Sequence, residues 1–143
     1  DSLIKDFRDN ISIILIDIDD FKSFNTKYGY SEADLLLKKL GILLGSDKRA
    51  TDETFRFFLF CDEFVVVANE TNLGEAFQAA ERKRKMISNN IFSIEDNKHQ
   101  LNVCCGVTTL TKEDTIETLT DRLSKALKEA KSIKGKNSTK SIS

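Results

Sequence analysis

The sequence is poor in the features that mark membrane, disulfide and zinc proteins. No apolar run approaches about 18 residues, the length of a membrane-spanning helix, and there is no signal peptide. The three cysteines form no CxxC pair, and Cys104 and Cys105 lie inside an apolar strand pattern, which favours reduced thiols in a cytoplasmic protein. The single histidine, His99, lies in a polar segment without a nearby Cys or His for zinc, so we expect its side chain to be exposed.

The sequence also lacks an excess of charge of either sign. Its 22 Lys and Arg residues nearly balance its 23 Asp and Glu residues, so no overall field draws it to nucleic acid or to an anionic membrane. With 143 residues, 40% of them hydrophobic, the chain is long enough for one domain and too short for two. Because it begins at Asp1 without an initiator methionine, we expect residues 1–143 to be a single domain from a longer multidomain protein.

What the sequence does contain is a series of short apolar runs separated by amphipathic segments. The β-branched run ISIILIDI at 11–18 predicts a buried strand, and a Ser31 cap predicts the start of a second helix. The remaining predicted strands are 55–60, 64–68, 91–95 and 101–110, and the predicted helices are 21–28, 31–45, 72–87 and 115–133. There is no proline and no internal repeat, and only the end of the chain, 138–143, has the composition of a flexible tail.

The order β-α-α-β-β-α-β-β-α indicates an α/β (α+β) fold. We expect one mostly antiparallel sheet of about five strands with helices packed on it, related to the ferredoxin-like plan. In this plan two acidic clusters follow apolar strands: Asp17-Ile18-Asp19-Asp20 after the first, and Asp62-Glu63 in the hairpin FCDEF. Carboxylate and carbonyl oxygens are the ligands that Mg²⁺ prefers, although acidic residues at strand ends can also be simple turn residues.

The residues between these clusters resemble a known signature. The string Asp17-Ile18-Asp19-x-Phe21-Lys22-x-x-Asn25-x-x-x-Gly29, followed by Asp34, resembles the first motif of the GGDEF family, the diguanylate cyclase domains. FCDEF stands where GGDEF belongs, and the other resembling segments are Arg49-x-x-Asp52-x-x-x-Arg56, 101–107, 125–131 and 135–137. The resemblance covers about residues 11–137 and implies the cyclase-palm form of the predicted fold.

The resemblance also implies an activity and a site. Members of this family condense two GTP into cyclic di-GMP between two facing domains, so the resemblance implies a homodimer. It assigns Mg²⁺ or Mn²⁺ to Asp17, the Ile18 carbonyl and Asp62, and phosphate contacts to Lys22, Lys131 and Lys136. The remaining assignments are guanine recognition by Asn25 and Asp34 beside Tyr30, catalysis by the signature residues Asp62 and Glu63 with Lys22, and product binding by Arg49 and Asp52.

The sequence departs from the family pattern where the chemistry takes place. Phe60 and Cys61 replace two glycines, and the Arg56 to Asp62 interval is two residues longer than usual. We therefore expect Asp62 to remain an acidic group of the hairpin, but not necessarily at metal-binding distance from Asp17. Tyr30 replaces a usual His, and Ala33 a usual Gly. We therefore expect a catalytically impaired domain that binds GTP or cyclic di-GMP as a regulatory module. The alternatives are an active Mg²⁺-dependent cyclase and a dimerisation or interaction module that binds no nucleotide.

Overall fold

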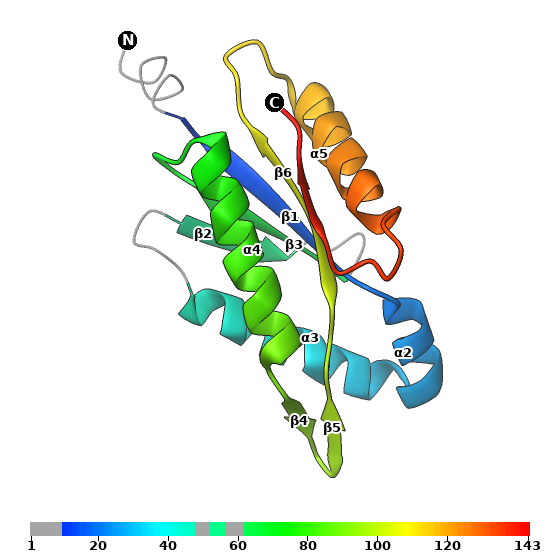
Figure 1. Cartoon of the computed structure of the whole chain (residues 1–143). Helices are drawn as coiled ribbons and strands as arrows, with labels where there is room; N and C mark the ends of the chain where they lie inside the picture. The colour runs from blue at the N-terminus through cyan, green and yellow to red at the C-terminus, as the bar shows by residue number, and fades with distance from the viewer. Residues whose placement is uncertain (1–9, 48–51, 57–61) are drawn as a thin grey trace.

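The fold is a five-stranded sheet with helices on both faces (Figure 1). The structure is a computed structural model that describes residues 10–47, 52–56 and 62–143. The strands occur in the order β2-β3-β1-β6-β7, and their bounds are β1 Ser12–Ile18, β2 Asp52–Arg56, β3 Glu63–Ala68, β6 Val103–Thr109 and β7 Thr139–Ser141. All neighbours pair antiparallel except β6 and β7, which are parallel. The predicted mixed fold with a mostly antiparallel sheet of about five strands is confirmed.

The central position of β1 explains its continuous apolar sequence. It lies between β3 and β6, and all seven of its residues are buried. Ile14 and Ile16 belong to the core formed with helices α3 and α4, whereas Ile13 and Leu15 belong to a second core formed with α5. Since both faces of the strand are covered, both sets of side chains must be apolar.

Four helices lie in the described part of the chain: α2 Phe21–Tyr28, α3 Tyr30–Ser46, α4 Leu73–Asn89 and α5 Ile116–Lys131. The Asn72 side chain and Glu75 form a reciprocal capping box that starts α4, in agreement with the predicted helix start. The predicted Ser31 cap is wrong, because α3 already begins at Tyr30. Gly29, with φ 87°, joins α2 directly to α3 and leaves Ser31 in the first turn.

Two segments differ from the predicted strands. Residues 92–99 form a separate hairpin, β4 Phe92–Ile94 with β5 Asn97–His99, which projects beyond the main sheet next to α3 (Figure 1). The predicted strand at 91–95 therefore does not pair with the one at 101–110. The residues predicted as a flexible tail, 138–143, instead contain β7, whose backbone pairs with β6 from Cys105 to Val107. An edge strand needs only backbone hydrogen bonds, so a polar sequence can form it.

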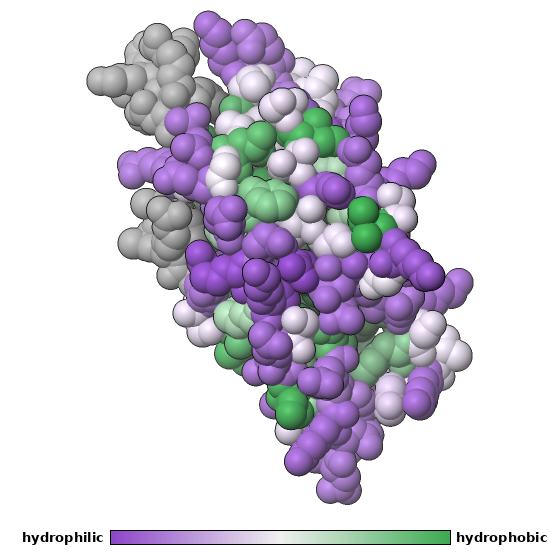
Figure 2. All heavy atoms as spheres, viewed as in Figure 1, coloured by the Kyte–Doolittle hydropathy of each residue, from purple (hydrophilic) through white to green (hydrophobic). Residues whose placement is uncertain are grey.

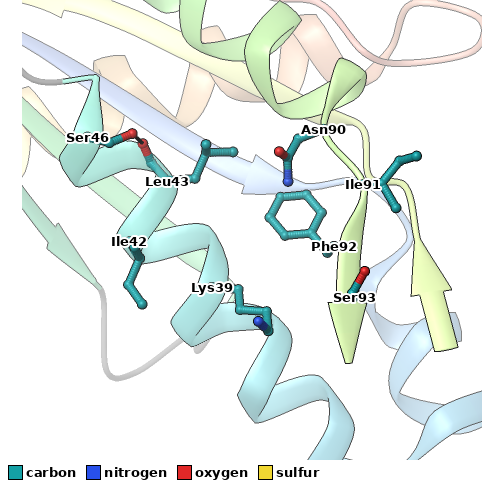
Figure 3. A pocket seen from close by; sticks show the side chains of 8 residues that line it. All are labelled: Lys39, Ile42, Leu43, Ser46, Asn90, Ile91, Phe92 and Ser93. Carbon is teal, nitrogen blue, oxygen red and sulfur yellow. Dashed lines mark hydrogen bonds between the residues drawn. The ribbon is translucent and has the colours of Figure 1, made fainter. Parts of the chain in front are cut away.

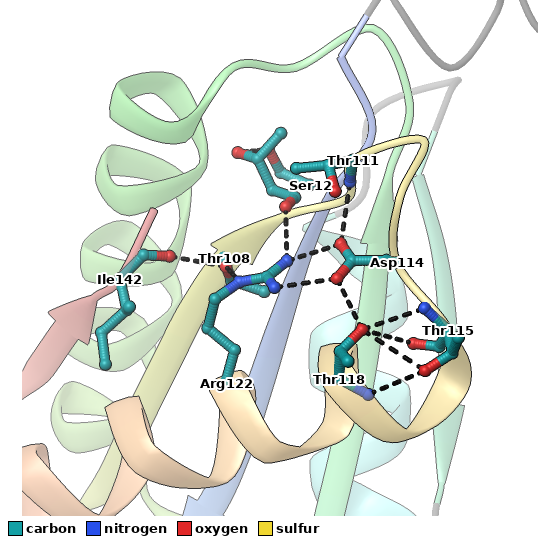
Figure 4. A network of polar contacts seen from close by, with 9 residues as sticks. Ser12, Thr108, Thr111, Asp114, Thr115, Thr118, Arg122 and Ile142 are labelled. Atoms are coloured by element: carbon teal, nitrogen blue, oxygen red, sulfur yellow. Dashed lines mark hydrogen bonds and ion pairs between the residues drawn. The ribbon is translucent and has the colours of Figure 1, made fainter.

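A buried network at the start of α5 fastens this helix to the sheet (Figure 4). Arg122 donates from Nη1 and Nη2 to the Asp114 carboxylate at 2.9 and 2.7 Å, and from Nε to Thr108 Oγ1 at 2.7 Å. Thr108 in turn donates to the Ile142 carbonyl just after β7. The Asp114 side chain is 4% exposed, and its hydrogen bonds with Arg122 hold the pKa of that carboxyl well below its usual range.

The surface seen in Figure 2 is mostly hydrophilic, with hydrophobic atoms in small separate groups around α4 and α5. Among the described residues, no helix is both long and apolar enough to cross a lipid bilayer. The buried apolar residues are concentrated in the two cores on either side of the sheet.

Candidate functional site

The two predicted acidic clusters meet at the end of β1. Antiparallel pairing of β1 with β3 places Asp17 opposite Glu63, and the Ile18 N–H donates to the Asp62 carbonyl at 3.3 Å. The Asp62 carboxyl lies close enough to Asp17 for the two side chains to raise the pKa of Asp62. The longer interval therefore leaves Asp62 beside the end of β1, and its metal-binding distance from Asp17 stays a prediction. The register of β3 fixes Asp62 from its own side, whatever the number of residues that precede it.

The carboxyl groups of this acidic site lie close enough to perturb one another. Burial, together with the charge of Asp17 and the hydrogen bond to it, raises the pKa of Asp62 to about 6. Burial, followed by the charges of Asp17 and Asp62, raises the pKa of Glu63 to about 7. Like charges in a partly buried site disfavour simultaneous ionisation, so the site favours a bound cation or a proton.

A lysine from α5 supplies part of the missing positive charge. Lys131 Nζ lies 2.7 Å from Asp17 Oδ2 and 3.8 Å from Asp19 Oδ1. Burial lowers the pKa of Lys131, but the hydrogen bond and charge of Asp17 outweigh this and leave the pKa raised. The predicted phosphate contact of Lys131 stays a prediction; the carboxylates that it contacts are Asp17, which the resemblance assigns to a metal ion, and Asp19.

The oxygen atoms of the acidic site fit a hard divalent cation. Asp17 Oδ1 and Asp19 Oδ1 are buried without a hydrogen-bond partner, and burial and the nearby Asp17 charge raise the pKa of Asp62. Within the described ranges, no group of three or more His, Cys, Asp or Glu side chains forms a metal cage by itself. A cation would thus need backbone or phosphate oxygens in addition to Asp17 and Asp62, as is common for Mg²⁺.

The predicted base-recognising residues lie on either side of the Gly29 turn. Asn25 on α2 is partly buried, and its Oδ1 atom is buried without a hydrogen-bond partner. Asp34 on α3 is partly exposed and forms an ion pair with Lys38 at 3.2 Å. Lys22 is exposed on α2, and Tyr30 is 84% exposed, so its side chain does not close over the turn.

The end of α5 and the following turn fold back on the first acidic cluster. Lys136 Nζ lies 2.9 Å from Asp20 Oδ1, and the Asn137 N–H donates to Asp19 Oδ2 at 2.9 Å. Lys136 is therefore beside the strand end that carries Asp17, despite the irregular spacing of this segment. Arg49 of the predicted product-binding pair lies outside the described residues, and Asp52 is described only as the first residue of β2.

His99 lies in a polar cluster that the sequence analysis missed. Its side chain is buried, 6% exposed, which corrects the predicted exposed histidine. The ring packs on Phe24 and Tyr28 of α2, and Nε2 lies 2.6 Å from Glu32 Oε2 on α3. The aromatic pair at 24 and 28, four residues apart on one helix face, was the only local signal that a third ring could pack there.

Two cavities lie near these elements. One of about 330 Å³ lies between the start of α2 and residues 100–102, and its wall includes Asp19, Lys27 and Asn102. The other, of about 390 Å³, lies between α3 and the start of β4 (Figure 3). Figure 3 shows Phe92 and Leu43 in the space between these elements. No residue predicted for the site lines the second cavity, whereas Ile18 lines the first.

Comparison with known proteins gives matches over nearly the whole chain. The model of a family described as "Diguanylate cyclase, GGDEF domain" matches residues 2–137. The response regulator PleD of Caulobacter vibrioides (strain NA1000 / CB15N) is 34% identical over 137 residues, which cover 92% of this chain and 30% of PleD. The chain thus spans under a third of the length of this relative.

Solved structures share the same fold. The active GGEEF domain of a diguanylate cyclase from Vibrio cholerae is 30% identical, with a TM-score of 0.83 over 99% of this chain and 88% of that one. The GGDEF domain of DgcB from Caulobacter crescentus, solved in complex with c-di-GMP, is 18% identical, with a TM-score of 0.81 over 92% of this chain and 77% of that one. At that identity the second structure supports the fold alone.

Proposed function

Because the chain belongs to the diguanylate cyclase GGDEF domain family, we propose that it binds guanine nucleotide, as GTP or cyclic di-GMP, and acts as a regulatory module in cyclic di-GMP signalling. One observation carries the proposal. The buried side-chain oxygens without a hydrogen-bond partner in the described residues belong to Asp17, Asp19 and Asn25. Buried polar atoms are nearly always hydrogen-bonded in a folded protein, so these three acceptors, two at the end of β1 and one on α2, indicate a ligand that donates to them or coordinates them.

The guanine base of the proposed ligand would supply hydrogen-bond donors, and the phosphates would accept from nearby lysines. Guanine carries a ring N–H and an exocyclic amino group, and both can be donated to Asn25 and Asp34. Adenine lacks this pair of donors. A buried acceptor such as Asn25 Oδ1 would stay without a hydrogen bond to adenine, and this cost discriminates strongly against the wrong base. Lys22 and Lys136 would contact the phosphates, and their charges would stabilise the triphosphate.

The metal ion of the proposal is Mg²⁺ or Mn²⁺, held by the carboxylates of Asp17 and Asp62 and by the Ile18 carbonyl. When bound, such an ion neutralises phosphate charge and polarises the phosphoryl group. The contact between Lys131 and Asp17 supports this site, because a positive group already lies against the same carboxylate. With a metal ion bound, the Lys131 ammonium is available to the phosphates instead.

We propose that the domain still binds nucleotide but has lost efficient catalytic turnover. Phe60 and Cys61 add side chains where the family signature has two glycines that let the substrate approach the backbone. A misplacement of about 1 Å can cost on the order of 10²-fold in rate. The proximity of Asp62 to Asp17 favours a second candidate, an active cyclase with an unusual turn, because the two proposed metal ligands remain neighbours despite the longer interval.

The test is calorimetric titration of the 143-residue chain with GTP and Mg²⁺, with chromatography of the product from the same sample. Binding without cyclic di-GMP supports the regulatory module, and binding with accumulation of cyclic di-GMP supports the active cyclase instead. ATP is the control nucleotide, and Asp34→Ala is the control variant. Absence of GTP and cyclic di-GMP binding would refute the proposal and leave the dimerisation or interaction module.

A second experiment separates the turn from the metal site. The double replacement Phe60→Gly and Cys61→Gly restores the usual signature without touching Asp17 or Asp62. If the turn alone limits catalysis, this variant gains cyclic di-GMP synthesis while its GTP affinity changes little. If the variant binds GTP and still makes no product, the altered turn does not account for the impairment.

A further inference from the structure

The β4–β5 hairpin reaches the turn that carries the proposed guanine readers. It lies outside the main sheet and next to α3 (Figure 1). Asn97 Nδ2 donates to both carboxylate oxygens of Glu32 at 3.1 and 3.0 Å, and His99 Nε2 lies 2.6 Å from Glu32 Oε2. The side chains of His99 and Glu32 are 6% and 15% exposed, so the contact between them is largely shielded from water, whereas the Asn97 contacts are exposed.

The same histidine ring also holds α2. Its centroid lies 4.7 Å from the Phe24 ring at an interplanar angle of 69°, and 4.6 Å from the Tyr28 ring at 77°. These edge-to-face arrangements are favourable for aromatic pairs. His99 thus contacts α2 through its ring and α3 through Nε2.

A contact between α2 and α3 matters because the single residue that links them, Gly29, is conformationally permissive. Gly29 has φ 87°, and no side chain caps the start of α3. Asn25 follows Phe24 directly on α2, and Asp34 lies two residues after Glu32 on α3. The contacts of His99 therefore fix the relative position of the two helices, and with it the distance between Asn25 and Asp34.

We propose that Glu32 and His99 are positioning residues that hold Asn25 and Asp34 in register with a guanine base, so that this pair sets the selectivity for guanine. The inference rests on the proposed guanine nucleotide function of the same site. Neither residue contacts the base. Each acts through the helix that carries a reader, and a change in the pair alters base discrimination more than phosphate binding.

The experiment compares Mg²⁺-supported binding of GTP and of inosine triphosphate, which lacks only the exocyclic amino group of guanine. Calorimetry gives the ratio of the two affinities for the wild type and for Glu32→Ala, Glu32→Gln and His99→Phe. In Glu32→Ala, loss of the contact with His99 is expected to lower the GTP affinity by about tenfold. The ratio of GTP to inosine triphosphate affinity should fall by the same factor, the equivalent of one hydrogen bond. Glu32→Gln keeps one acceptor oxygen, which can still accept from His99 or Asn97, and should restore part of the ratio. His99→Phe keeps the ring packing and should give an intermediate value.

Asp114→Ala is the control, because it removes a carboxylate just before α5 that is even more buried than that of Glu32, with 4% against 15% of the side chain exposed. A loss of folded protein lowers both affinities equally and leaves their ratio unchanged. If Glu32→Ala and His99→Phe lower the melting temperature but keep the wild-type ratio, the residues are merely structural and the inference is wrong. If the wild type itself fails to bind GTP, or does not prefer it over inosine triphosphate, guanine reading in the proposed function fails as well.

Discussion

Replacing Asp62 by asparagine should stabilise the metal-free domain while removing its response to Mg²⁺. Asp62 lies against Asp17, and its pKa is raised from an ordinary 3.8 to about 6, first by burial and then by the charge of Asp17. A rise of this size corresponds to about 3 kcal/mol against the ionised form. Because Asp62 is partly exposed and solvent screens the repulsion, we expect the gain on removing the charge to be about 1–3 kcal/mol at pH 8.

The sign of the pH dependence follows from the raised pKa. Between about pH 4 and pH 6 the folded state holds a proton that the unfolded state has released, so stability falls as the pH rises through this window. Above it the full cost of the ionised Asp62 is present. The wild type and Asp62→Asn should therefore be equally stable near pH 4 and should diverge towards pH 8. A change of this size shifts the melting temperature of a domain of this length by about 2–10 °C.

The assay is urea unfolding followed by circular dichroism, in EDTA and in Mg²⁺, from pH 4 to pH 8. Mg²⁺ should stabilise the wild type and have little effect on Asp62→Asn. Asp114→Asn is the control of opposite sign, because its hydrogen bonds with Arg122 lower the pKa of Asp114 and its ionised form stabilises the fold at neutral pH. Equal or lower stability of Asp62→Asn at pH 8 in EDTA would refute the account of carboxylate repulsion at this site.

Three further predictions concern α5 and its contacts. Arg122→Ala leaves the buried Asp114 carboxylate without its ion pair and should cost about 3–5 kcal/mol in urea unfolding, the loss shrinking below about pH 4, where Asp114 is neutral in the unfolded state. A pH-independent loss would contradict this reason. In Gly106→Ala the new Cβ would lie 2.7 Å from the Leu127 backbone N, so we expect a cost of about 1–3 kcal/mol, whereas Gly45→Ala meets nothing within 4 Å and should be neutral or stabilising. Equal unfolding midpoints for Gly106→Ala and Gly45→Ala would show that α5 moves away from the new Cβ without cost. Lys131→Ala removes the cation at the acidic site and should weaken GTP binding about tenfold or more in calorimetry, while unchanged affinity would exclude a phosphate contact.

The main sheet could be predicted because its strands carry their own local signal. From Ile13 to Ile16 the run is apolar and mostly β-branched, as a strand covered on both faces requires. The start of α4 was visible in Asn72 and Glu75, which need only each other to form a cap. By contrast, β7 is polar, and nothing in its side chains predicts the backbone pairing with β6 that defines it.

The site was partly predictable for the same reason. Asp17 and Asp62 end or precede strands that pair as neighbours, so their meeting follows from sheet register once the strands are correctly identified. The pair of Glu32 and His99 depends on the approach of a hairpin to a helix turn, 67 residues away in sequence. Neither residue forms a motif on its own. Such a contact is specified by tertiary packing and leaves no periodic pattern in the sequence.

Because Asp17 and Asp62 remain neighbours, any catalytic impairment of this domain is expected to come from the turn residues and not from the carboxylates. An insertion before Asp62 could have separated the carboxylates, but β3 is held in register by its pairing with β1, and Asp62 enters the site from that strand. The carboxylate pair, Lys131 and the unpaired Asn25 oxygen then remain compatible with a metal ion and a guanine nucleotide. Within the hairpin signature itself, the replaced residues are Phe60 and Cys61, which would meet the substrate rather than the metal ion. If only the turn is altered, we expect the domain to bind GTP but to make little cyclic di-GMP.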